Sequence, residues 1–227
     1  MSDPVEALFA SIRAGDVAAV SALVAQRPEL AAARNPQGIS AVLWACYTHQ
    51  PEALAAVLAA RPSLDLFEAA AAGLDEDVRA RLERVPDLVH AWSTDGFTAL
   101  HLAAYFGHAA AATRLLSLGA DARAEARNAT RVTPLHSAVA AGAHAIAAAL
   151  LERGADPDAR QQQGFTALMA AAQQGDAAMV ERLLAQGADP GLCADDGRAA
   201  ADFADQESHH ALAATLRDAK RRPPPNT

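Results

Sequence analysis

The residues best suited to chemistry in this sequence are its eight histidines. His209 and His210 lie close to Asp205 and Glu207, and imidazole and carboxylate groups are common ligands of transition metals. Adjacent histidines on a helix diverge by about 100°, however, and no His-x3-His pair accompanies them. We therefore predict no metal ion and no other cofactor.

Motifs of known enzyme classes are absent from the sequence. There is no G-x-S-x-G nucleophile motif, no phosphate-binding loop and no G-x-G-x-x-G after a strand pattern. The two cysteines, Cys46 and Cys193, lie far apart and form no C-x-x-C pair, which favours free thiols and a reducing compartment. We therefore expect a protein that is not an enzyme.

The charge balance argues against nucleic acid as a partner. The chain has 19 basic and 27 acidic residues and a formal net charge of −8, whereas phosphate-backbone binding needs clustered Lys and Arg. Its only lysine is Lys220. Arginine in place of lysine, together with abundant alanine, indicates a GC-rich bacterial genome.

Nothing in the sequence predicts secretion or a membrane span. The first ten residues, MSDPVEALFA, have no basic segment followed by an apolar run, and no stretch of about 18 residues is free of Gly, Pro and charge. We expect a cytoplasmic protein that does not bind membranes.

The elements that would position functional side chains recur along the chain. Residues 95–121 read DGFTALHLAAYFGHAAAATRLLSLGAD, and similar stretches return at 133–156 and 164–189. The spacing is 33 residues from Gly164 to Gly197 and 33 from Arg131 to Gly164, but 35 from Gly96 to Arg131. Self-similarity with a period near 33 is typical of a protein built from stacked repeats.

The residue pattern within each repeat predicts two helices joined by a tight turn. A threonine stands where the first helix needs an N-cap, a glycine follows that helix, and a second glycine ends the next helix. These positions are Thr98, Thr133 and Thr166, then Gly107, Gly142 and Gly175, then Gly119, Gly154 and Gly187. We call the segment that joins one helix pair to the next a finger.

This pattern resembles the ankyrin repeat, whose consensus reads approximately G-x-T-P-L-H-x-A-A-x-x-G-H and later L-L-x-x-G-A-D. Three consecutive copies carry the resemblance, and weaker copies flank them. It implies an all-α solenoid of about seven stacked helix-turn-helix repeats with short finger loops. Only 24 residues separate His49 from Gly73, so we expect the finger between the second and third repeats to be missing.

The resemblance implies a single domain over residues 1–219. The predicted repeats cover residues 4–36, 37–62, 63–94, 95–129, 130–162, 163–195 and 196–219. Residues 220–227, KRRPPPNT, are predicted to be a disordered basic, proline-containing tail.

The resemblance gives two of the histidines a structural role. His101 and His136 fall in the position where the imidazole of an ankyrin repeat bridges to the backbone of a neighbouring finger. Met169 occupies the same place two repeats after His101, so the imidazole is not indispensable there.

Aromatic residues are few in this chain, but four of them, Trp92, Phe97, Tyr105 and Phe106, lie within fifteen residues. In ankyrin repeats the position after the finger glycine and the two before the helix-ending glycine line the concave, partner-facing surface. Large exposed aromatics are frequent binding hot spots. The predicted partner-binding residues are Phe97, Tyr105 and Phe106, their equivalents Phe165 and Tyr47, and Gln173 and Gln174.

Two other interpretations of the aromatics stay open. Phe97 and Phe165 would also suit packing against adjacent fingers, and Trp92 would suit closure of the third repeat. Trp44 aligns with Leu102, an interior position, which predicts that it lies in the core.

The sequence therefore predicts a monomeric, non-catalytic scaffold or adaptor that binds a protein on its concave face. One alternative is a metal-dependent or enzymatic regulator that uses the histidines. Another is a self-associating structural protein that buries the aromatic residues against its own copy.

Overall fold

The computed structural model describes residues 3–60 and 62–221, and these contain fourteen α-helices and three short 3₁₀-helices. Within the described residues, β-pairing is limited to isolated bridges such as the one between Arg160 and Thr166. The all-α prediction is confirmed. The chain divides into two compact units, residues 1–88 and residues 89–227, which we call the N-terminal unit and the C-terminal unit.

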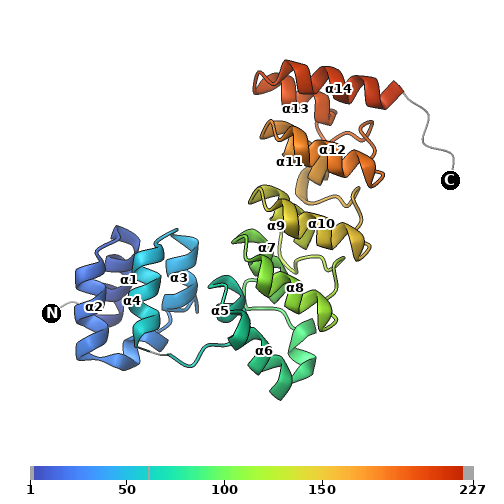
Figure 1. Ribbon diagram of the computed structural model, residues 1–227. Helices are drawn as coiled ribbons and strands as arrows, with labels where there is room; N and C mark the ends of the chain where they lie inside the picture. The colour runs from blue at the N-terminus through green and yellow to red at the C-terminus, as the bar shows by residue number, and fades with distance from the viewer. Residues whose placement is uncertain (1–2, 61, 222–227) are drawn as a thin grey trace. The chain divides into compact units, whose positions relative to one another are not determined.

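The N-terminal unit contains three helix pairs (Figure 1). They are α1 (Pro4–Ala14) with α2 (Val17–Gln26), α3 (Ala41–Tyr47) with α4 (Pro51–Ala59), and α5 (Leu66–Ala71) with α6 (Asp75–Arg84). Helix α1 contacts α3, and α2 contacts α4. Leu8, Ile12, Val20 and Val57 are completely buried in the core between these helices.

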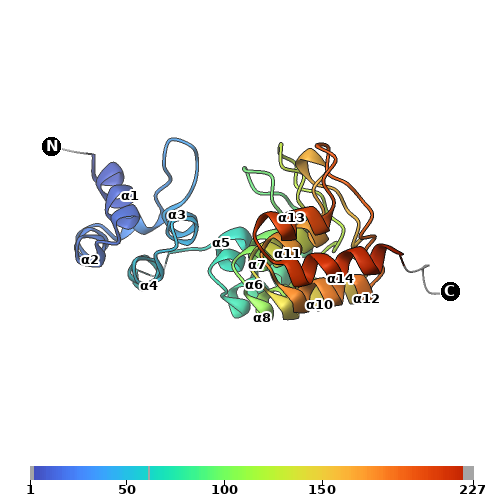
Figure 2. The ribbon, with the colours of Figure 1, turned by 90° about the horizontal axis from the view of Figure 1, so that it is seen from above.

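The C-terminal unit contains four helix pairs that stack in the order of the chain (Figure 1). They are α7 (Ala99–Tyr105) with α8 (Ala109–Ser117), α9 (Pro134–Ala140) with α10 (His144–Glu152), α11 (Ala167–Gln173) with α12 (Ala177–Ala185), and α13 (Ala200–Gln206) with α14 (His210–Arg221). We call the first helix of each pair the inner helix. The inner helices contact one another in turn, α7 with α9, α9 with α11 and α11 with α13. The fingers of this unit all project to one side of its helices (Figure 2).

The predicted caps and turn residues are present. Thr98 caps α7, with its hydroxyl 2.8 Å from Nδ1 of His101, and Thr133 caps α9 in the same way with His136. Gly107 follows α7 with φ +74°, a left-handed conformation that glycine adopts without steric cost. Local chemistry at the ends of each helix therefore sets the length of the helices.

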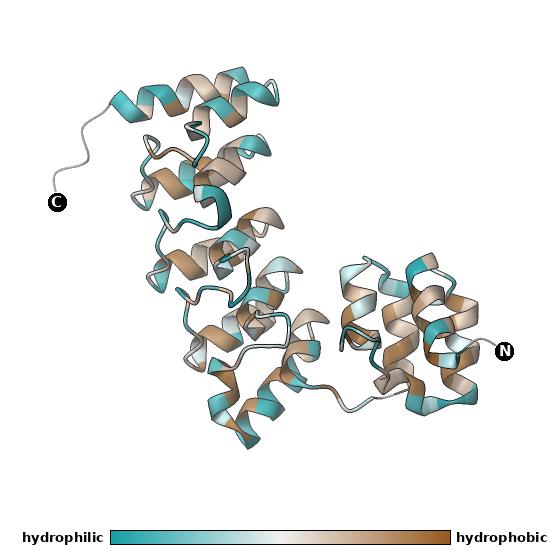
Figure 3. Ribbon diagram, turned by 180° about the vertical axis from the view of Figure 1, so that it is seen from behind, coloured by the Kyte–Doolittle hydropathy of each residue, from teal (hydrophilic) through white to brown (hydrophobic). Residues whose placement is uncertain are grey.

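Neighbouring fingers of the C-terminal unit pair through their backbones. Each bond runs from an N–H of one finger to a carbonyl of the finger before it: Arg127 to Gly96 at 2.8 Å, Gln162 to Thr130 at 2.8 Å and Asp195 to Gln163 at 2.9 Å. Figure 3 shows that these fingers are mostly hydrophilic. Backbone hydrogen bonds therefore join the fingers, together with buried finger alanines such as Ala124 and Ala126.

The boundaries between repeats differ in length. Helix α4 ends at Ala59 and α5 begins at Leu66, and this separation is too short for a finger of the kind seen elsewhere in the chain. The fingers that follow α2 and α6 begin with the 3₁₀-helices η1 (Pro28–Ala32) and η2 (Pro86–His90), which the sequence did not predict.

The end of the chain differs in part from the prediction. Helix α14 continues through Lys220 to Arg221, two residues into the predicted tail, because its amphipathic pattern persists to that point. The rest of that tail, residues 222–227, lies outside the described residues. The single domain over residues 1–219 stays a prediction.

Candidate protein-binding surface

The exposed Tyr105 and the half-buried Phe106 form an aromatic pair at the end of α7. Tyr105 is 43% exposed, although the other six residues of this helix are buried. The rings of Tyr105 and Phe106 lie 5.1 Å apart at an interplanar angle of 81°, an edge-to-face geometry that holds both in place. The chain therefore presents a rigid apolar surface to solvent at the turn between α7 and α8.

Phe97 lies at the opposite end of the same helix. It precedes the N-cap Thr98, and its ring centroid is 5.9 Å from that of His101. A helix of this length separates its two ends by about 10 Å, since each residue adds 1.5 Å. The structure thus does not bring Phe97 into the aromatic pair. It places Phe97 at the base of a finger and Tyr105 at the turn.

Phe165 is half-buried between two repeats. Its ring makes an edge-to-face contact with Phe203 of α13, with centroids 4.9 Å apart, and the guanidinium of Arg198 lies 4.2 Å from the Phe203 ring. The sequence left open that Phe165 packs against an adjacent finger, but this ring packs against the inner helix of the next repeat. One edge of the ring remains available beside a small pocket that it shares with Gln163 and Asp196.

Gln173 and Gln174 lie on the same row of turns as Tyr105, two repeats further along the chain. They are exposed and end α11 at the same register as Tyr105 and Phe106 end α7. The amide Nε2 of Gln174 donates to the carbonyl of Ala140 at 3.4 Å, and Ala140 holds this register in the repeat between them. Aromatic, small and amide side chains therefore follow one another along the turns.

Tyr47 ends α3 in the N-terminal unit and is half-buried. It belongs to a different compact unit from the other predicted residues. Its role in binding stays a prediction.

His101 makes the predicted bridge to the next finger. The backbone N–H of Thr98 donates to Nδ1 at 3.2 Å, so Nδ1 must be unprotonated, and Nε2–H then donates to the carbonyl of Val132 at 3.0 Å. Burial lowers the pKa of His101 to about 4, partly offset by the Val132 carbonyl. The imidazole is therefore neutral near pH 7 and joins two repeats.

His136 repeats the cap but not the bridge. Thr133 N–H donates to its Nδ1 at 3.2 Å, whereas Nε2 makes no well-formed hydrogen bond within the described residues. Burial lowers the pKa of His136 to about 4, and the backbones of Phe165 and Ala159 offset part of this shift. This buried imidazole is therefore also neutral near pH 7.

The remaining histidines of the C-terminal unit that we considered as ligands do not converge. His210 pairs with Asp205 at 3.0 Å, whereas the ring of His209 packs against the turn at Gly175. Within residues 3–60 and 62–221, no group of three or more His, Cys, Asp or Glu side chains could hold a metal ion.

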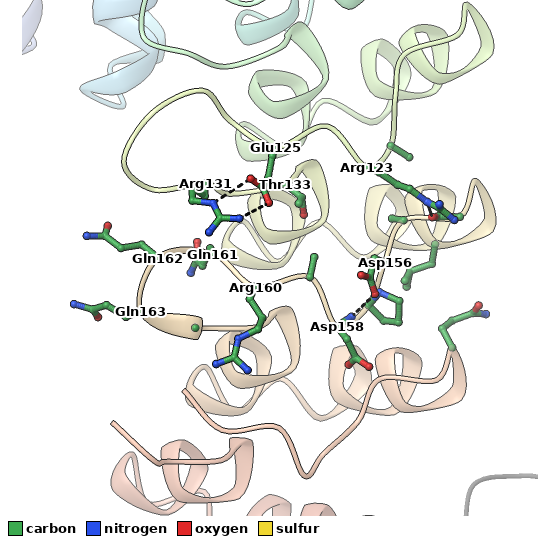
Figure 4. A pocket seen from close by; sticks show the side chains of 18 of the residues that line it. Arg123, Glu125, Arg131, Thr133, Asp156, Asp158, Arg160, Gln161, Gln162 and Gln163 are labelled. Atoms are coloured by element: carbon green, nitrogen blue, oxygen red, sulfur yellow. Dashed lines mark hydrogen bonds and ion pairs between the residues drawn. The ribbon is translucent and has the colours of Figure 1, made fainter. Parts of the chain in front are cut away.

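A pocket of about 1040 Å³ lies among the fingers of the C-terminal unit (Figure 4). Its arginines are already engaged: Arg131 makes two bonds to the carboxylate of Glu125, at 2.9 and 3.1 Å, and Arg160 donates to the Cys193 carbonyl at 2.9 Å. Neutralised arginines make a poor phosphate site. The pocket offers hydrogen bonds to a partner and no reactive group. No motif in the sequence predicted this pocket, although the spacing of 35 residues from Gly96 to Arg131, two more than in the next repeats, indicates a longer finger.

The two cysteines are free thiols with different surroundings. Cys46 is buried and its Sγ lies 3.5 Å from the Ala71 carbonyl, and burial raises its pKa to about 12. Cys46 is therefore a thiol packed in the interior. Since the thiolate is the reactive form, this cysteine is inert in the folded protein.

A thiol assay tests this difference. With a disulfide reagent at pH 8, we expect only Cys193 to react with the native protein, and Cys46 to react after urea is added. The Cys193→Ser variant should then show no reaction until it unfolds. Rapid reaction of native Cys193→Ser would contradict the burial of Cys46.

Comparison with known proteins identifies the repeats. Family models described as ankyrin repeats match residues 66–161 and 150–204, and together they cover most of the chain. The chain belongs to the ankyrin repeat family. Ankyrin repeats generally act as protein–protein interaction modules, and nothing in these matches points to an enzymatic activity.

Ankyrin repeats of several animal proteins are similar to this chain. It is 49% identical over 74 residues to the Neurogenic locus Notch protein of Drosophila melanogaster and 50% identical over 74 residues to human Neurogenic locus notch homolog protein 2. It is 38% identical over 111 residues to mouse Ankyrin repeat and SOCS box protein 16. These alignments cover 32%, 32% and 45% of this chain, but only 3%, 3% and 24% of the relatives.

The helices of this ankyrin repeat chain are short. In the part of the chain that the structure describes, none is long and apolar enough to cross a bilayer.

Proposed function

We propose that this ankyrin repeat protein is a non-catalytic scaffold or adaptor that binds a protein segment along the turns of its C-terminal unit. The observation that carries the proposal is the aromatic pair of Tyr105 and Phe106. Tyr105 is 43% exposed at the end of a helix that is otherwise buried, and its ring rests edge-to-face on the half-buried Phe106. Rigid aromatics of this kind supply much of the affinity of protein interfaces.

The neighbouring turns support an extended partner segment. Ala140 and Ala141 follow Tyr105 in the stack and leave room beside its ring, and the exposed amides of Gln173 and Gln174 come next. A segment with one apolar side chain against Tyr105 and polar groups toward the glutamines would match this order. The net charge of −8 favours a partner surface that is neutral or basic.

Whether Tyr105 contacts a partner can be tested with a matched control position. Leu118 is also a large exposed apolar residue, 46% exposed, but it follows α8 at the far end of that helix. A photo-crosslinking residue at position 105 and one at position 118 would capture what each position contacts in cells. We expect a discrete crosslinked species from position 105 only.

Measuring both the affinity for the captured partner and the free energy of unfolding then distinguishes an effect on binding from an effect on folding. Tyr105→Ser should weaken it about tenfold, or about 1.4 kcal/mol, and Leu118→Ser should leave it unchanged. Both variants should keep the free energy of unfolding within about 0.5 kcal/mol of the parent, because both side chains are exposed. Equal affinities of Tyr105→Ser and the parent would refute the assignment of this surface.

The same crosslinking experiment addresses self-association. A crosslink between two copies of this chain at position 105, together with a dimer in light scattering that Tyr105→Ser dissociates, would favour the self-associating alternative. We expect a monomer in both variants.

A further inference from the structure

A second candidate binding site lies in the N-terminal unit, between α1 and the tip of the first finger. It is a pocket of about 430 Å³, lined on the α1 side by Val5, Phe9 and Ala10 and on the finger side by Pro36. Trp44 also lines it. The Trp44 indole N–H donates to the Phe9 carbonyl at 3.1 Å, and the two rings lie 6.1 Å apart. The indole is therefore fixed in position.

Trp44 is half-buried, which differs from the core position that the sequence predicted. Phe203 in the last repeat stands at the same register, since each lies four residues after the N-cap of its inner helix. Phe203 is only 4% exposed. The ring of Phe165 from the preceding repeat covers Phe203 edge-to-face, with centroids 4.9 Å apart. The Phe9 ring lies beside Trp44, with centroids 6.1 Å apart, but no aromatic ring comes from the register of Phe165. Phe165 lies ten residues before the turn glycine Gly175, and the position ten residues before Gly15 is Val5, a smaller side chain that lines the pocket.

The finger beside the pocket lacks one of the backbone donors by which later fingers pair. Gln162 and Asp195 each donate their N–H to the preceding finger from two residues before the finger glycine. In the first finger this glycine is Gly38, so the equivalent residue is Pro36, which has no N–H. An occupant of this position gains no backbone hydrogen bond at that register, so side chains carry more of its binding.

Charges lie along α1 at the edge of the pocket. Asp3 and Glu6 line one part of it and Arg13 lines another, and Glu6 and Arg13 are about 10 Å apart along the helix. Neither Glu6 nor Arg13 forms an ion pair with any described residue. The end of the pocket beside Asp3 and Glu6 therefore complements a basic group, which would pair with these two carboxylates.

We propose that this pocket binds an aromatic side chain of a partner protein, in an extended segment that carries a basic residue next to the aromatic one. The aromatic ring fills the space beside Trp44 that Val5, a smaller side chain than Phe165, leaves open. The basic residue pairs with Glu6 and Asp3. This site is independent of the surface at Tyr105, so either can fail without the other.

Tryptophan fluorescence tests the proposal directly. In the Trp92→Phe variant of the full chain, Trp44 is the only tryptophan, and its emission reports on the pocket. We expect the peptide acetyl-Gly-Phe-Arg-Gly-amide to change this emission saturably, with a dissociation constant in the millimolar range that suits a single anchored side chain. The Phe-Glu peptide should bind about fivefold more weakly, as expected for exposed charge pairs. The Ala-Arg peptide should not saturate.

Matched variants locate the site on α1. Ala10 is exposed and lines the pocket, whereas Ala14 is exposed on the same helix but does not. Ala10→Gln should abolish the fluorescence response, and Ala14→Gln should leave it unchanged. Glu6→Gln should reduce the preference for Phe-Arg over Phe-Glu to less than about twofold.

Three results would overturn the proposal. They are no saturable response to the Phe-Arg peptide, an equal response to the Ala-Arg peptide, and binding that Ala10→Gln leaves intact. A change in Trp44 emission with protein concentration alone would show instead that a second copy of the chain occupies the pocket. Circular dichroism of each variant at the same protein concentration would show that it is folded.

Discussion

Lowering the pH from 7.5 to 5.0 is expected to reduce the free energy of unfolding of the C-terminal unit by about 4 kcal/mol. His101 and His136 have folded-state pKa values of about 4, against about 6.5 in the unfolded chain. The unfolded state therefore binds protons that the folded state does not, and stability rises with pH in this window. The contribution of each neutral histidine to the free energy of unfolding is complete above pH 6.5 and is lost as the pH falls toward 4. At pH 5 each histidine has lost about 2 kcal/mol of it.

The structure shows why the folded state resists protonation at these two positions. Both side chains are buried, at 1% and 4% exposure, and Nδ1 of each accepts the backbone N–H of its capping threonine. A protonated Nδ1 cannot accept that bond, so charging the ring would break the cap. Carboxylates titrate mainly below this pH window.

Urea titration at the two pH values measures the effect. In a Trp44→Phe variant, the emission of Trp92 follows the C-terminal unit alone, which matters because repeat arrays need not unfold in one step. The double variant His101→Met/His136→Met is the control, since Met169 is accommodated at the same register and is 1% exposed. It should be less stable at pH 7.5, but almost independent of pH down to 5. An equal pH dependence in the parent and the double variant would show that other groups are responsible.

Replacing Gly96 by alanine is expected to destabilise the C-terminal unit by about 3 kcal/mol. Gly96 has φ +85°, and a Cβ atom there would lie 2.8 Å from the backbone carbon and oxygen of Arg127. The carbonyl of Gly96 also accepts the N–H of Arg127 at 2.8 Å, so the clash acts on a backbone hydrogen bond between two fingers. Backbone atoms cannot move aside as a flexible side chain can.

Gly107→Ala is the matched control for this prediction. Gly107 has φ +74°, but a Cβ atom there would meet nothing within 4 Å. This substitution should cost only the left-handed strain, about 1 kcal/mol. Unfolding followed by Trp92 emission would compare the two variants. Equal losses in Gly96→Ala and Gly107→Ala would mean that the contact with Arg127 contributes nothing.

The fold was predictable from the sequence where local chemistry decides it. Threonine caps and turn glycines specify their own conformations within a few residues, so the ends of α7, α9 and α11 were predicted correctly. The bridge from His101 to the next finger followed from the resemblance to the ankyrin repeat, and the structure confirms it.

The candidate site was less predictable because it depends on packing between repeats. The sequence grouped Phe97 with Tyr105, but one precedes the N-cap of α7 and the other ends the helix. The contact of Phe165 with Phe203 requires the spacing between two repeats, which no single repeat contains. Trp44 was expected in the core because it aligns with Leu102. At the equivalent position of the last repeat, Phe203 is buried against Phe165, whereas the first repeat has the smaller Val5 at the register of Phe165 and Trp44 stays half-buried.

Pro36 also limits how copies of this protein can assemble. In the last finger, the carbonyl of Asp196 stands at the register where Thr130 and Gln163 accept the N–H of the following finger. At that register a second chain stacked end to end would present position 36, where proline has no N–H. Repeated head-to-tail contacts that never close produce open filaments. This single residue therefore removes one backbone bond that would support filament growth through the fingers.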